Sequence, residues 1–181
     1  FTYYNKLQAS GRELWFYTCG GPQGEYANRM IQLPLIKTRL LPWIDYRYGA
    51  TGFLHWGYNF WKHDRDPKKV IAAAYGTGRP DSVAGDPWIV YPRRHGLGVI
   101  DSIRWEAQRD GCCDHELLSQ LGERDPKAAH ELAAKEIPGF ASYQTNVNTF
   151  RQLRRQLLQA VSALPAAGSS GNASTAAKVH E

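Results

Sequence analysis

The stretch GFLHWGYNFW, residues 52–61, places five aromatic residues and one histidine within ten positions. Its first half belongs to a short apolar segment, residues 50–56, which is typical of a buried strand. Side chains alternate between the two faces of an extended chain, so His55 would face one side and Trp56 the other. The pattern therefore predicts a strand that carries aromatic side chains to its end.

A second strand of the same kind precedes this one. Residues 13–19, ELWFYTC, are short and rich in aromatic residues, and Gly20-Gly21-Pro22 ends the segment. Between the two strands, residues 33–49 carry apolar side chains at helical spacing, and Pro42 predicts a kink or two shorter helices. A strand, a helix and a strand in direct succession are typical of a parallel βα unit.

The chain becomes mostly helical further on. Lys62–Pro87 is rich in Asp, Gly, Pro and Lys and predicts a long surface loop, with one short helix at Val70–Tyr75. Trp88–Pro92 is a third strand-like stretch. The helices expected after it span residues 102–111, 112–121, 126–136 and 148–164. The fold class is α/β, and the succession predicts the last portion of a parallel barrel or sheet.

Composition bounds the partners and the compartment. The 181 residues are 43% hydrophobic with a net charge of +5, no stretch is long enough to span a membrane, and no dense basic stripe favours nucleic acid. No signal peptide is visible at Phe1, where we expect a preceding part of the protein to be missing. Three cysteines without metal-binding spacing favour free thiols and a reducing, cytoplasmic compartment; some secreted bacterial enzymes have the same pattern, so a periplasmic or secreted location is the alternative.

The candidate binding residues are aromatic side chains at the strand ends and one amide among them. Tryptophan and tyrosine at such positions suit carbohydrate, because the apolar face of a sugar packs on a ring while its hydroxyls reach polar edges. Core packing is the alternative reading, and the Asn59 amide among the rings favours the sugar. The candidates are Trp15, Tyr17, Trp56, Tyr58, Asn59 and Trp61.

The acidic residues offer no catalytic pair of their own. Glu25, Asp64, Asp66 and Asp86 lie in loops, and none is expected at an apolar strand end that would raise its pKa. Residues 104–110 alternate arginines and acids, which predicts an ion-paired network that anchors a helix to the sheet; a substrate-binding arginine is the alternative. Neither the histidines nor the glycines have the spacing of a metal or phosphate site, so no metal and no cofactor is expected.

Four segments in this order carry a family resemblance. They are ELWFYTCGGP, PLIKTRLLPWIDYRYGATGFLHWGYNFW, GDPWIVYP and DSIRWEAQRDGCCDHELL, and they cover residues 11–121 approximately. The sequence resembles the C-terminal part of the catalytic domain of glycoside hydrolase family 123-like proteins, a region formerly described as a domain of unknown function. Pro87, His115 and Leu117 depart from the residues usual in that pattern, which puts detail in the loop and helix in question.

The resemblance implies a (β/α)8 TIM-type barrel and a retaining hydrolase of β-linked N-acetylhexosamines of the N-acetylgalactosamine type. In such enzymes the substrate's acetamido oxygen attacks the anomeric carbon, an Asp orients the acetamide and the adjacent Glu is the general acid/base. No Asp-Glu dipeptide occurs in residues 1–181, so no catalytic residue is assigned here, and the pair is expected upstream. The aromatic candidates and Asn59 would line the sugar subsite.

This interpretation divides the chain into three parts. Residues 1–122 would be the late strands and helices of the barrel, 123–165 a helical extension and 166–181 a disordered tail. The expected partners are carbohydrate and either the missing N-terminal part or another copy of the chain, because an open barrel exposes strand edges. The alternative is a non-catalytic carbohydrate-binding or structural module that uses the same rings without chemistry.

Overall fold

The computed structural model describes residues 2–61, 66–70, 83–95 and 97–165. These ranges contain two pairs of strands, five named helices and one further helical turn at residues 67–70. The elements, in chain order, are α1 Thr2–Ala9, β1 Trp15–Thr18, α2 Leu35–Tyr48, β2 Gly52–His55, β3 Val90–Pro92, β4 Val99–Asp101, α4 Ile103–Arg124, α5 Pro126–Glu136 and α6 Val147–Ser162.

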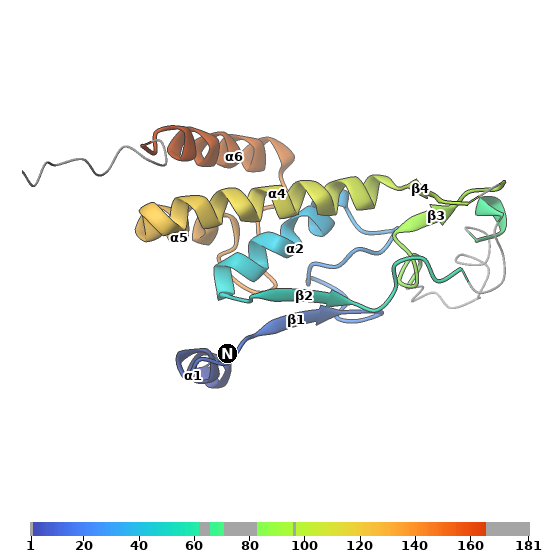
Figure 1. The fold of residues 1–181 in the computed structure, drawn as a ribbon, viewed down its shortest axis with the longest axis horizontal. Helices are drawn as coiled ribbons and strands as arrows, with labels where there is room; N and C mark the ends of the chain where they lie inside the picture. Colours follow the sequence, from blue (N-terminus) through green and yellow to red (C-terminus); the bar gives the residue numbers. More distant parts are fainter. Residues whose placement is uncertain (1, 62–65, 71–82, 96, 166–181) are drawn as a thin grey trace, which may run out of the picture.

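The predicted strand–helix–strand unit is present. β1 pairs with β2 in parallel, with Trp15 opposite Gly52 and Thr18 opposite His55. α2 joins the two strands and covers one face of the pair (Figure 1). Phe16 and Phe53 point to that covered face and pack against the helical core. By alternation, Thr18 and His55 lie on this face too, and the opposite face carries Trp15, Tyr17 and Leu54.

α2 runs as one helix through Pro42 and ends at Gly49, which adopts a left-handed conformation with φ 68°. The alternative of two shorter helices is therefore wrong. Pro42 lies in the middle of a helix whose surrounding residues, Leu41 and Trp43 among them, are buried. Burial of this segment between the strands and the following helices outweighs the backbone hydrogen bond that a proline removes.

Successive layers of helices lie behind the strands. In Figure 1 the strand pair is followed by α2, then by α4 with α5, and α6 lies farthest from the strands. Trp43 of α2 contacts Phe150 of α6 edge to face, with ring centroids 5.6 Å apart. Leu118 of α4 and Leu157 of α6 are fully buried in the same core. The helices after residue 122 thus share one hydrophobic core with the βα unit.

α4 is one continuous helix, whereas the sequence predicted two helices on either side of Gly111. That prediction is wrong, and the reason is close packing. A Cβ atom at Gly111 would lie 2.4 Å from the carbonyl oxygen of Arg39 and 3.1 Å from the ring of Pro42. The glycine allows α4 to approach the backbone of α2, and it does not end the helix.

Asp114 connects three helices from within this core. Its side chain is fully buried and accepts hydrogen bonds from Arg39 Nε at 2.9 Å, Arg154 Nε at 2.7 Å and Trp43 Nε1 at 3.2 Å. The two arginines come from α2 and α6, so opposite charge compensates the buried carboxylate from both sides.

The third strand-like stretch forms a separate hairpin. β3 pairs with β4 in antiparallel fashion, and neither joins the β1–β2 sheet. The described ranges therefore form a mixed α/β fragment, and no closed barrel is seen within them. None of the helices in these ranges is both long and apolar enough to span a bilayer. Most of the expected loop and short helix between Lys62 and Pro87, and the expected tail at 166–181, lie outside the described residues.

Candidate functional site

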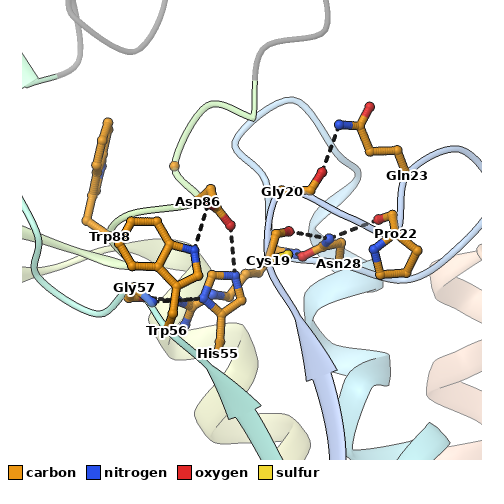
Figure 2. A network of polar contacts seen from close by, with 12 residues as sticks. Cys19, Gly20, Pro22, Gln23, Asn28, His55, Trp56, Gly57, Asp86 and Trp88 are labelled. Atoms are coloured by element: carbon orange, nitrogen blue, oxygen red, sulfur yellow. Dashed lines mark hydrogen bonds and ion pairs between the residues drawn. The ribbon is translucent and has the colours of Figure 1, made fainter.

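The carboxyl ends of β1 and β2 point to the same group of polar and aromatic side chains (Figure 2). His55 ends β2, and Trp56 and Gly57 follow it directly. From β1, the chain turns at Cys19 into a loop in which Asn28 donates hydrogen bonds to the carbonyls of Cys19 and Pro22, both at 3.0 Å. Carboxyl ends of neighbouring parallel strands form one edge of a sheet, where binding sites are commonly built.

A segment from the other side of the long loop returns across the end of β2. Asn59 and Trp88 form an antiparallel bridge, Phe60 N–H donates to the Pro87 carbonyl at 3.0 Å, and Ile89 N–H donates to that of Tyr58 at 2.8 Å. The approach is close. A Cβ atom at Gly57 would lie 2.4 Å from the Asp86 carbonyl oxygen, so only glycine fits there. The bridge brings Asp86 next to His55 and Trp56.

Hydrogen bonds fix the tautomer of His55. Its Nδ1 atom lies 2.5 Å from Arg29 Nη2 and 3.2 Å from the Gly57 backbone nitrogen, and both of these groups are donors. Nδ1 therefore accepts, and the ring proton is on Nε2, which faces Asp86 Oδ1 at 3.3 Å. Burial, together with the charges of Arg29 and Arg104, lowers the pKa of His55 to about 3. The imidazole is neutral.

Asp86 accepts a hydrogen bond from the indole N–H of Trp56, with 2.8 Å between Nε1 and Oδ2. Its side chain is 8% exposed, and burial raises the pKa of its carboxyl, although the hydrogen bond from Trp56 and the charge of Arg29 act in the opposite direction. The sequence-based expectation that no loop carboxylate would show a raised pKa is wrong for Asp86. The return of its loop onto the apolar end of β2 is the cause.

Arg104 anchors the first turn of α4 to this region. Its guanidinium donates to the carbonyls of Arg29 at 2.6 Å, Gly85 at 3.1 Å and Trp88 at 2.8 Å. Arg104 thus anchors α4, but not in the predicted way: the acceptors in these contacts are backbone carbonyls of segments outside β1 and β2, whereas the prediction was an ion-paired network to the sheet. The exposed pair of Arg109 and Glu106, 2.5 Å apart, lies on the surface.

A family comparison identifies the domain to which this arrangement belongs. The model of the glycoside hydrolase 123 catalytic domain matches residues 2–121, which is more than half of the chain. The chain belongs to the glycoside hydrolase 123 catalytic-domain family. No curated protein matches the sequence.

A solved structure of this family has a similar fold. A family 123 glycoside hydrolase from Clostridium perfringens, described in connection with glycolipid glycan hydrolysis, is 18% identical in sequence with a TM-score of 0.56. The alignment covers 87% of the present chain and 27% of that protein. The present chain therefore corresponds to about a quarter of the glycosidase that it matches.

Within this glycoside hydrolase 123 fragment, the predicted binding residues do not all lie together. Tyr17 is exposed on the face of the strand pair opposite α2, near the carboxyl end of β1, and Trp56 is exposed directly after the end of β2. Trp15 lies on the same face but at the beginning of β1, opposite Gly52. With about 3.3 Å per residue, the four positions between Gly52 and Trp56 correspond to about 13 Å along the strand. Trp15 and Trp56 are thus at opposite ends of the strand pair.

The other three predicted residues belong to the segment after β2. Tyr58 is 43% exposed and contacts Trp105 of α4 edge to face, at 5.4 Å between centroids. Asn59 is exposed and forms the bridge to Trp88. Trp61 donates its indole N–H to the Val90 carbonyl at 2.9 Å. These residues hold the returning segment, and Tyr58 and Asn59 also keep exposed surface.

The sequence interpretation missed the buried polar residues that lie next to the exposed aromatic side chains. Arg29, His55 and Asp86 form the buried polar group, and only the strand-end position of His55 carried any signal in the sequence. Several buried polar atoms of this region have no hydrogen-bond partner within the described residues, namely Thr18 Oγ1, Arg29 Nε, His55 Nε2, Asp86 Oδ1 and Trp88 Nε1. Two of these atoms, His55 Nε2 and Asp86 Oδ1, face each other at 3.3 Å. In the same ranges, no group of three acidic, histidine or cysteine side chains is placed to hold a metal ion.

The arrangement of these residues is suited to binding a ligand and orienting it. The His55 side chain is 2% exposed and that of Asp86 is 8% exposed, so neither reaches a substrate in the described arrangement. Trp56 presents part of its ring to solvent above them, with 47% of the residue exposed. The surface is an aromatic platform supported from below by buried polar groups.

Proposed function

We propose that this chain is the C-terminal part of a (β/α)8 catalytic domain that hydrolyses β-linked N-acetylhexosamine, of the N-acetylgalactosamine type. Membership in the glycoside hydrolase 123 family is the observation that carries the proposal. Glycans of glycolipids are a candidate source of the substrate, because the Clostridium perfringens relative is described with that hydrolysis. The reaction would proceed with retention, through attack of the substrate's own acetamido oxygen on the anomeric carbon.

The proposed role of the present chain is to bind the sugar. Tyr17 and Trp56 are exposed at the carboxyl ends of two adjacent parallel strands, the edge of a barrel at which active sites are built. A pyranose ring can stack on the Trp56 indole, and Tyr58 and Asn59 are near enough in sequence to contribute to the rim of the same subsite. Trp15, at the other end of β1, would instead fill the interior of the barrel.

The exposed face of the strand pair is an argument for a partner that covers it. Trp15, Tyr17 and Leu54 are each at least 50% exposed on it, which is unusual for a group of large apolar side chains. Strands supplied by an N-terminal part of the same protein, or by another copy of the chain, would cover this face and pair with the strand edges that are unpaired within the described residues. The Asp-Glu pair of the proposed mechanism would come from the N-terminal part, because residues 1–181 contain no such dipeptide.

Release of a chromophore from an aryl N-acetyl-β-galactosaminide tests the proposed reaction in the natural polypeptide that carries residues 1–181. We expect release, with the β-anomer of the sugar appearing first in the NMR spectrum because the mechanism retains configuration. An α-anomer as first product would contradict the substrate-assisted route. Binding of the sugar without any release would support the alternative, a carbohydrate-binding module without catalysis.

A further inference from the structure

Trp56 has an exposed ring whose plane is held by a hydrogen bond. The residue follows β2 directly, so its backbone is fixed by the strand on one side and by the close approach of Gly57 to the Asp86 backbone on the other. The ring contacts Phe60 at 5.7 Å between centroids, with 57° between their planes. The remaining constraint is the bond from Nε1 to Asp86 Oδ2 at 2.8 Å. Without it, the indole could turn about its side-chain bonds.

Asp86 is itself held in place. Its backbone N–H donates to the Val83 carbonyl at 2.9 Å, and the bridge between Asn59 and Trp88 fixes the segment that follows. The second carboxylate oxygen, Oδ1, faces the protonated Nε2 of His55 at 3.3 Å (Figure 2). The carboxylate thus lies between two N–H groups, one on each oxygen.

His55 can present an N–H group to Asp86 because its other ring nitrogen, Nδ1, already acts as an acceptor. Arg29 and the Gly57 backbone both donate to Nδ1, which leaves the proton on the side of Asp86. The groups that face Asp86 are therefore a neutral imidazole N–H, an indole N–H and, at longer range, the Arg29 guanidinium. All three favour a carboxylate acceptor over a neutral amide.

We propose that Asp86 is a positioning residue that sets the plane of the Trp56 indole for stacking against a sugar ring, with His55 fixing the orientation of the Asp86 carboxylate. The proposal rests on the proposed function, because it assigns a task to the ring that binds the sugar. Asp86 does not touch the substrate in this scheme; it acts through Trp56 alone.

The substitution Asp86→Asn tests the proposal with the smallest change of shape. A carboxylate presents an acceptor oxygen to both N–H groups, whereas an amide presents an oxygen to one and must turn its NH₂ towards the other. In the 15N–1H NMR spectrum of the natural polypeptide, loss of one indole signal in Trp56→Phe assigns that of Trp56. We expect Asp86→Asn to move this signal and to speed its exchange with water, while the other indole signals remain in place.

Affinity for methyl N-acetyl-β-galactosaminide provides the functional readout, measured by calorimetry on the natural polypeptide. We expect Asp86→Asn to weaken binding about fivefold, the usual net value of one hydrogen bond. Trp56→Phe keeps a ring but lacks the N–H, so it should weaken binding to a similar degree, and Asp86→Asn should then cause no further loss. Trp56→Phe also keeps the test valid if Asp86→Asn does not fold.

Two results would separate the possible failures. An equal loss from Asp86→Asn in the wild-type and Trp56→Phe backgrounds, with the Trp56 signal unmoved, would overturn the positioning role while the sugar site stands. Unchanged affinity in Trp56→Leu, which removes the ring altogether, would overturn the proposed sugar site and the positioning role with it.

Discussion

Two buried carboxylates show how differently the helical core and the strand ends are built. In the core, Asp114 is fully buried and receives hydrogen bonds from two arginines and a tryptophan. At the strand ends, Asp86 is almost as buried, but its two nearest partners are a neutral histidine and an indole. The first arrangement compensates a charge to join helices. The second holds a ring in place at a surface.

The largest expected effect lies in the core. Asp114→Ala would leave Arg39 and Arg154 without their common partner, and we expect a loss of about 3 kcal/mol in the free energy of unfolding. Urea denaturation measures it. Asp110→Ala is the matched control, because Asp110 also binds Arg39, at 3.2 Å, but is 47% exposed. That control should change stability by about 0.5 kcal/mol or less, and equal losses in both variants would contradict the distinction.

Two glycines of α4 sharpen the account of helix packing. Gly111→Ala would bring its Cβ within 2.4 Å of the Arg39 backbone, so α2 and α4 would have to separate, at a cost of about 2 kcal/mol. In Gly122→Ala the new atom would lie 2.4 Å from the Tyr46 hydroxyl, which is the far end of a side chain and can shift, and at an ordinary contact distance of 3.7 Å from the Ala129 side chain. The alanine also favours the helix by up to about 1 kcal/mol.

Thermal unfolding of the two variants compares them directly. We expect Gly111→Ala to melt at a lower temperature than the wild type and Gly122→Ala to melt near or above it. A Gly111→Ala protein as stable as the wild type would show that α4 does not depend on this close approach.

The strand ends should respond to pH through His55. Its pKa in the folded protein, about 3, is below the ordinary value of 6.5, so the unfolded chain binds a proton that the folded protein excludes. The contribution of His55 to stability should therefore fall as the pH decreases from 6.5 towards 3, by at most about 1.4 kcal/mol per pH unit. His55→Asn, which keeps an acceptor near the position of Nδ1, should show a shallower loss in urea titrations between pH 7 and pH 4. Parallel profiles would contradict the neutral, buried imidazole.

The βα unit could be predicted from sequence, because its signals are local. Alternation and length define β1 and β2, and helical spacing defines α2. Gly111 could not be interpreted in this way, since a glycine is compatible with the end of a helix and with the close passage of another chain segment. Which of the two applies depends on α2, whose packing against α4 has no local signature.

The polar group at the strand ends could not be predicted from the sequence, for a related reason. His55 and Asp86 are far apart in sequence, and they meet because residues 83–89 return across the end of β2. No period or motif predicts that return. The aromatic residues were visible from composition, but only the register of β1 and β2 shows that Trp15 and Trp56 lie at opposite ends of the strand pair.

Those two tryptophans offer the most direct test of the central claim, that the carboxyl ends of β1 and β2 form a sugar-binding edge. The measurement is the affinity of the natural polypeptide for methyl N-acetyl-β-galactosaminide, with Trp56→Leu and Trp15→Leu compared. We predict about tenfold weaker binding for Trp56→Leu, from the loss of the stacked ring, and unchanged binding for Trp15→Leu. Equal affinities in the two variants, or a loss confined to Trp15→Leu, would contradict it.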